Sequence, residues 1–148
     1  GSAVPNLYSP HVPAAFDATC GTYDAANYTN ACQGHRFLCG DALSSQFAQC
    51  MTAIDCKMYV DMQAQHAEPD YVVSFIHQMI PHHINAVNMA RVLLKLSATY
   101  GDGTLGVDIT GTGANHDGVE DMLLDMVNTQ NYQISGMRKW PLEQRRPL

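Results

Sequence analysis

The sequence Met-Ile-Pro-His-His-Ile-Asn-Ala-Val-Asn-Met at positions 79–89 is the most informative stretch of the chain, because it combines two adjacent histidines with flanking methionines. On an α-helix, where each residue turns by about 100°, His82 and His83 flank an apolar stripe. The stripe consists of Val72, Phe75, Met79, Ala86 and Ala90. A helix that buries this stripe offers both imidazoles to its neighbours, whereas His77 points the opposite way, to water. Because a buried imidazole needs hydrogen-bond partners, the pair indicates either satisfied core histidines or ligands.

Three long amphipathic stretches predict an all-α fold. They cover residues 41 to about 67, about 71 to 97, and 115 or 117 to about 139, after which Pro141 is expected to stop the last helix. Glu68-Pro69-Asp70 is a short break, so the first two helices should form an antiparallel hairpin with Asp70 as the N-cap of the second. We expect a helical bundle of three to four helices, with residues 41–140 as a single domain.

The cysteines, at positions 20, 32, 39, 50 and 56, indicate a disulfide-tethered N-terminal region. Residues 3–40 contain prolines and glycines without a clear apolar period, and we expect them to be irregular. The cysteine spacings contain no CxxC pair, so a zinc knuckle is not expected. Two disulfides formed in an oxidising compartment explain the cysteines better. At least one bridge should tie Cys50 or Cys56 to the N-terminal region. The fifth cysteine stays unpaired or links two copies into a homodimer.

Charge and composition narrow the classes of partner. The net charge is −6, with 8 Lys and Arg residues among 148, which argues against a nucleic-acid surface and is compatible with cation binding. No apolar run is long enough to insert into a membrane. Asn27-Tyr28-Thr29 is an N-glycosylation sequon, typical of a secreted glycoprotein. No nucleophile elbow or phosphate loop is present, which favours a non-enzymatic protein.

Soft metal ligands recur on the faces that should meet in the bundle. Eight methionines occur in the chain. Thioether sulfur suits Cu(I), and imidazole suits copper more generally, whereas calcium and magnesium prefer oxygen ligands. The sequence therefore predicts a copper(I) site, with silver(I) as a second soft ion and zinc as an alternative. Its predicted ligands are His82, His83, Met79 and Met89 on the second helix, Met62 and His66 on the first, and Met122 and Met126 on the third.

The pattern Phe75-x-x-x-Met79-Ile80-Pro81-His82-His83, followed by Ala86-x-x-Met89-Ala90, resembles the signature of the family catalogued as domain of unknown function 305. The resemblance covers residues 70–140 and implies a ferritin-like helical bundle. Some members bind copper and silver outside the cytoplasm, so it also implies extracytoplasmic copper binding. The run Gln130-x-x-Gln133-Ile134-x-x-Met137-x-x-Trp140 resembles the C-terminal motif of the family. Gln133 stands where that motif usually has glutamate, so one carboxylate is missing.

Di-iron chemistry does not fit this chain despite the ferritin-like resemblance. Such sites need inward glutamates and Glu-x-x-His pairs, and none of the chain's glutamates, at positions 68, 120 and 143, begins such a pair. Three interpretations follow. The first is an extracytoplasmic protein that binds or sequesters copper through Met and His ligands inside a helical bundle. The second is a structural or protein-interaction helical module with a Met-rich core and no metal. The third is a copper- or zinc-dependent enzyme with His82 and His83 as ligands.

Overall fold

The structure, a computed structural model, describes residues 14–40, 45–63, 70–99 and 118–144. Its elements are α1 (Ala15–Cys20), the 3₁₀ turn η1 (Ala25–Tyr28), α2 (Gln46–Gln63), α3 (Tyr71–Thr99) and α4 (Val119–Glu143). All regular elements in these ranges are helical, which confirms the all-α prediction. Three long helices are present as expected, and the N-terminal region adds a short fourth.

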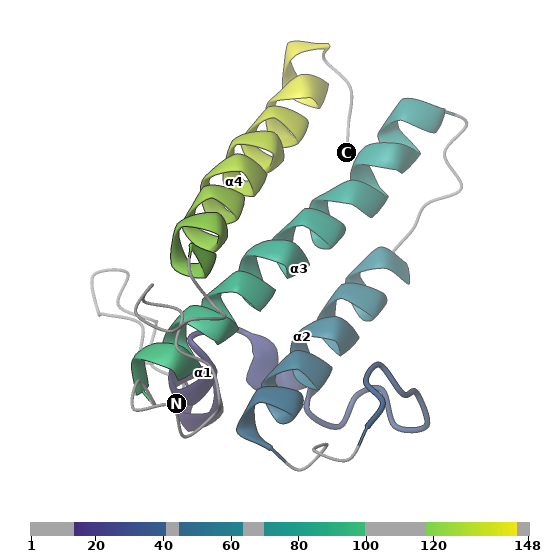
Figure 1. Cartoon of the computed structure of the whole chain (residues 1–148). Helices are drawn as coiled ribbons and strands as arrows, with labels where there is room; N and C mark the ends of the chain where they lie inside the picture. The colour runs from purple at the N-terminus through teal and green to yellow at the C-terminus, as the bar shows by residue number, and fades with distance from the viewer. Residues whose placement is uncertain (1–13, 41–44, 64–69, 100–117, 145–148) are drawn as a thin grey trace, which may run out of the picture.

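The long helices form an open bundle with α3 in the middle (Figure 1). Helix α3 packs against α2 on one side and α4 on the other. Among the described residues, no Cα atom of α2 comes within 8 Å of one in α4. Helix α1 contacts α2, α3 and η1, and η1 also contacts α2. Helix α3 is therefore the only long helix of the described chain that touches both of the others.

The helix ends follow the sequence signals in part. Asp70 caps α3 as predicted, because its Oδ1 accepts hydrogen bonds from the N–H groups of Val72 (2.9 Å) and Val73 (3.3 Å). The helix then continues through Pro81. The predicted cap positions 41, 115 and 117 lie outside the described residues, and Gly118, with φ 80°, takes the N-cap position of α4. No described helix is long and apolar enough to cross a membrane.

The prediction that Pro141 stops the last helix is wrong. Helix α4 continues to Glu143, with Pro141 inside it. A proline this close to the C-terminal end removes only one backbone hydrogen bond, and the N–H of Gln144 still donates to the carbonyl oxygen of Trp140 at 3.0 Å. Pro141 is also among the fully buried side chains, so its ring contributes apolar burial at the end of the helix.

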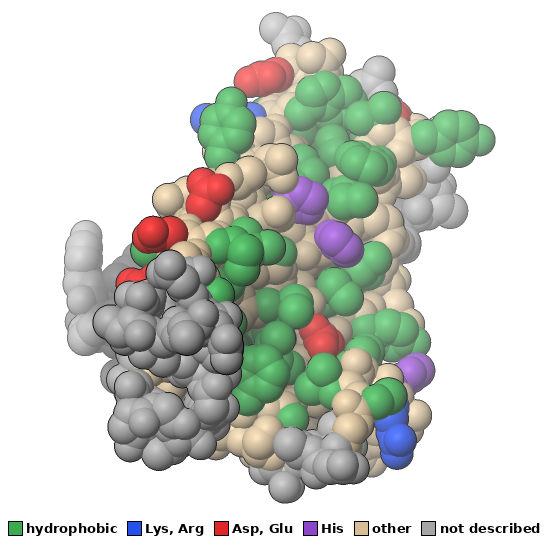
Figure 2. Space-filling view, viewed as in Figure 1, with side chains coloured by type: hydrophobic (Ala, Val, Ile, Leu, Met, Phe, Trp, Pro, Cys, Tyr) green, Lys and Arg blue, Asp and Glu red, His purple; other side chains and the backbone are tan. Residues whose placement is uncertain are grey.

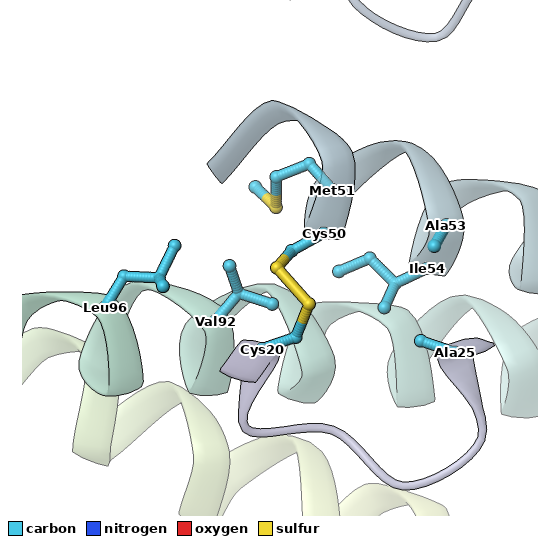
Figure 3. Close-up of a cluster of buried hydrophobic side chains, with 8 residues drawn as sticks. All are labelled: Cys20, Ala25, Cys50, Met51, Ala53, Ile54, Val92 and Leu96. Carbon is cyan, nitrogen blue, oxygen red and sulfur yellow. A yellow bond between two sulfur atoms is a disulfide. The ribbon is translucent and has the colours of Figure 1, made fainter. Parts of the chain in front are cut away.

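The larger hydrophobic cluster lies where α1, α2, η1 and α3 meet (Figure 3). Its members are Cys20, Ala25, Cys50, Met51, Ala53, Ile54, Val92 and Leu96. Ile54, Val92 and Leu96 are fully buried, and burying a side chain of this size stabilises the fold by about 1.5–3 kcal/mol. A smaller cluster joins α3 to α4 through Ala90 and Leu123. The main core therefore supports the junction of the N-terminal region with the α2–α3 hairpin.

Two disulfides hold the N-terminal region to α2, as predicted. They join Cys20 to Cys50 and Cys32 to Cys56, with Cα–Cα distances of 5.6 and 5.8 Å. Cys39 is free and exposed.

The described part of residues 3–40 is more regular than predicted, because it contains α1 and η1. The buried carboxylate of Asp17 organises it by accepting hydrogen bonds from Thr22 Oγ1 (2.6 Å) and from the N–H groups of Ala25 (2.7 Å) and Ala26 (3.2 Å). Hydrogen bonds of this kind produce no periodic spacing of apolar residues, so hydrophobic periodicity did not predict α1 and η1.

Candidate metal centre

Part of the apolar stripe that the sequence assigns to the core lies on an open side of α3, although Ala90 of the stripe is buried. Val72 and Phe75 are 48% and 57% exposed, and Met89, which flanks the stripe, is 39% exposed. Figure 2 shows hydrophobic side chains, with histidines among them, over much of one face of the molecule. Val72 and Phe75 remain exposed because no Cα atom of α2 comes within 8 Å of one in α4 in the described chain, so these helices do not close over this end of the stripe.

A hollow of about 260 Å³ lies on this open side, between the first half of α2, the second half of α3 and the start of α4. It is lined by Phe47, Met51, Ala86, Met89, Ala90, Leu93, Met122, Leu123 and Met126, and we call it the methionine groove. None of these side chains is charged. Four are methionines, and they come from three helices, so the groove gathers thioether sulfur in a largely apolar setting.

The groove takes up part of the predicted ligand set and adds one residue to it. Met89, Met122 and Met126 were predicted and line it, whereas Met51 was not among the predicted ligands. Met51 shares a helical face with Met58 and Met62, and that spacing was the signal that could have identified it. Met62 and Met79 are half-buried and do not line the groove. His66 lies outside the described residues.

His83 has both ring nitrogens engaged. Nδ1 lies 3.0 Å from the carbonyl oxygen of Met79, and Nε2 lies 2.8 Å from the Gln133 side chain. Both partner atoms are oxygens that accept, Met79 O and Gln133 Oε1, so the imidazole is the donor, and its tautomer determines which nitrogen carries the hydrogen. The imidazole therefore ties α3 to α4. It could bind a metal only by giving up one of these two contacts.

His82 and His77 occupy different environments from each other. His82 is exposed, and its ring centroid lies 6.0 Å from that of His83. His82 is thus the more accessible member of the predicted pair. His77 was predicted to point to water, but it is half-buried with Nε2 shielded from solvent, so that prediction is wrong. In the described ranges, no group of three or more His, Cys, Asp or Glu side chains is placed to hold a metal ion.

A carboxyl group lies in the interface between α2 and α3. The side-chain amide of Asn85 donates a hydrogen bond to Oδ1 of Asp55 at 2.9 Å. Burial raises the pKa of Asp55, and this hydrogen bond opposes the rise only in part. Oδ1 of Asn85 is buried and accepts no hydrogen bond from any described residue. Desolvation therefore penalises the charged form of this carboxyl group in the folded protein.

Comparisons of the chain with known protein families, with curated proteins and with solved structures find no match.

Proposed function

We propose that this protein binds a soft monovalent metal ion, Cu(I) or Ag(I), through the thioether groups of the methionine groove. The observation that carries the proposal is the convergence of Met51, Met89, Met122 and Met126 from three helices on one apolar hollow. Thioether sulfur is a neutral, soft donor, which suits a monovalent soft ion better than zinc or a hard divalent ion. The donor set of the groove therefore fits copper(I).

Other features of the chain support an extracytoplasmic role for this protein. Two disulfides within one small chain are compatible with an oxidising compartment, where such bridges persist. Asn27 of the sequon is exposed, so an oligosaccharide there would meet no steric obstacle from burial. The resemblance of residues 75–90 to the domain of unknown function 305 family, with its ferritin-like bundle and copper-binding members, belongs to the same proposal and stays a prediction.

A second candidate function is an interaction module without metal. The apolar lining of the groove favours it, because exposed Val72 and Phe75 extend the apolar surface along α3. Methionine side chains are flexible and polarizable, and they repack around different apolar partners. The two candidates use the same residues, so only a measurement with metal separates them.

An anaerobic Cu(I) titration of the oxidised protein against a competing chelator, followed by metal analysis, tests the proposal. The variant Met89→Leu/Met126→Leu keeps the side-chain volume but removes two sulfur atoms, so the helix content should stay unchanged. We expect its Cu(I) affinity to fall at least about tenfold, the factor that corresponds to ~1.4 kcal/mol. Zn(II) should bind far more weakly than Cu(I) or Ag(I).

Met137→Leu is the matched control, because Met137 lies on α4 but does not line the groove. Its Cu(I) affinity should stay within about twofold of the wild type, a change of less than ~0.5 kcal/mol. Equal affinities for the wild type and the double variant would refute the methionine groove as the metal site. No stoichiometric Cu(I) or Ag(I) binding by the wild type would favour the interaction module instead.

A further inference from the structure

A second hollow, of about 350 Å³, lies along a different face of α3. Its walls come from the N-terminal region, α2, α3 and α4. It is lined by Tyr23, Asp24, Lys57, Ile84, Val87, Asn88, Arg91, Asn131, Ile134 and Arg138, and we call it the basic pocket. None of these residues lines the methionine groove. Asn88 and Met89 are adjacent in the sequence and line different hollows, because successive helical residues point about 100° apart.

The basic pocket collects positive charge in an acidic protein. The chain has a net charge of −6 and only 8 Lys and Arg residues, yet Lys57, Arg91 and Arg138 all line this hollow. One carboxylate, that of Asp24, lines it with them. Cations that share a hollow repel one another unless an anion lies between them. A bound anion would therefore stabilise this arrangement of three cationic side chains.

Two of the three cations are available to an external anion. Lys57 forms an ion pair with Asp61, and its Nζ lies 5.6 Å from the ring centroid of Tyr28. No carboxylate of the described residues pairs with Arg91 or Arg138. The guanidinium carbon of Arg91 lies 5.2 Å from the ring centroid of Tyr23, a cation–π contact that positions the guanidinium at the pocket wall. A guanidinium offers paired N–H donors that match the oxygens of a carboxylate or phosphate.

The other residues of the pocket lining indicate which chemical groups would be attached to such an anion. Val87 and Ile134 are each 5% exposed and, with Ile84, give the pocket an apolar part. The side-chain amides of Asn88 and Asn131 can donate and accept hydrogen bonds. A cavity of this size falls within the range of small-molecule sites, in which apolar walls and a few placed polar groups act together. The lining thus suits an anionic head group attached to a compact apolar body.

We propose that the basic pocket is a binding site for a small organic oxyanion, a carboxylate or a phosphate monoester, held by Arg91 and Arg138. The apolar body of this ligand would lie against Ile84, Val87 and Ile134. The site is separate from the methionine groove and goes beyond the proposed metal binding. Each can therefore be shown or refuted without the other.

Isothermal titration of the intact, oxidised protein with benzoate and with phenyl phosphate tests the proposal. These probes share a compact ring and differ in the oxyanion, so the tighter one identifies the class of head group. Benzyl alcohol is the neutral comparison and should not bind measurably. Arg138→Gln, at an exposed position where folding should be unaffected, should weaken binding of the tighter probe about tenfold, which corresponds to ~1.4 kcal/mol. Arg91→Gln should weaken it by a similar factor.

The matched control is Lys139→Gln, which removes one positive charge from the exposed residue next to Arg138 without altering the pocket lining. It should leave the affinity within about twofold, a change of under ~0.5 kcal/mol. Amide chemical-shift changes on probe addition should centre on Asn131 and Ile134. The proposal is overturned if neither probe binds saturably, or if Lys139→Gln weakens binding as much as Arg138→Gln. The second result would mean that net charge alone attracts the probes.

Discussion

Replacing the Cys20–Cys50 bridge in the Cys20→Ala/Cys50→Ala variant should lower the free energy of unfolding by about 4–5 kcal/mol, because two terms add. The bridge closes a loop with a sequence separation of 30, for which the chain-entropy estimate is roughly 3.6 kcal/mol. Both cysteines are 0% exposed within the main core. Each Cys→Ala substitution also replaces a buried sulfur atom with hydrogen, and the two together remove packing contacts worth on the order of 1 kcal/mol. Single domains have about 5–15 kcal/mol of stability, so this loss is a large fraction of it.

Urea denaturation followed by far-ultraviolet circular dichroism measures this change, and two further variants calibrate it. Cys32→Ser/Cys56→Ser opens a loop with a sequence separation of 24, for which the same estimate is roughly 3.4 kcal/mol. Cys39→Ser changes a free, exposed thiol and should leave stability within about 0.5 kcal/mol. A loss below about 1 kcal/mol in the Cys20→Ala/Cys50→Ala variant would refute the reasoning that this bridge restrains the unfolded chain.

Three further predictions concern single residues of the bundle. Because burial raises the pKa of Asp55, the folded state loses stability as pH rises above the unfolded value of 3.8. Asp55→Asn should therefore melt higher than the wild type at neutral pH, with an advantage that shrinks toward pH 3.8 in thermal scans. His83→Ala should cost about 1 kcal/mol in urea denaturation through the lost hydrogen bond to Gln133, whereas His82→Ala should leave stability unchanged because His82 is exposed. Gly136→Ala should raise the free energy of unfolding by up to about 1 kcal/mol, since no neighbouring atom lies within 4 Å of the added Cβ.

Each of these predictions has a control or an opposing outcome. Asp125→Asn removes one negative charge at an exposed position of α4 and is the control for the effect of net charge alone. If it reproduces the Asp55→Asn profile, net charge explains the effect. Reversed roles for the His82→Ala and His83→Ala variants would contradict the hydrogen-bond assignment of His83. A destabilised Gly136→Ala variant would show that α4 has a neighbour at this position in solution.

The helical architecture follows from local signals in the sequence. The break at residues 68–70 and the apolar spacing predict α2 and α3 closely, because Asp70 caps the helix through bonds within its own first turn. The attachment of the N-terminal region to α2 could also be predicted, since a segment with little periodic apolar content needs a covalent tether. Which cysteines pair could not be predicted, because pairing depends on the path that the buried carboxylate of Asp17 imposes between α1 and η1.

The candidate site was predicted only in part, for a geometric reason. Helical spacing identifies the faces that carry thioethers and imidazoles, and Met89, Met122 and Met126 do share a hollow. Periodicity does not tell whether a face is covered, so the whole stripe on α3 was assigned to a closed core although Val72 and Phe75 are exposed. The hydrogen bond from His83 to Gln133 joins residues 50 positions apart, and no local pattern specifies such a contact.

The disulfides divide the molecule into units that should open at different free energies. Both bridges join the N-terminal region to α2, so neither includes α4. Among the described elements, α4 has only α3 as a backbone neighbour within 8 Å. Its amide hydrogens should therefore exchange with solvent through a local opening that leaves the cross-linked unit folded. Because α4 forms a wall of both the methionine groove and the basic pocket, a ligand in either would slow this exchange first.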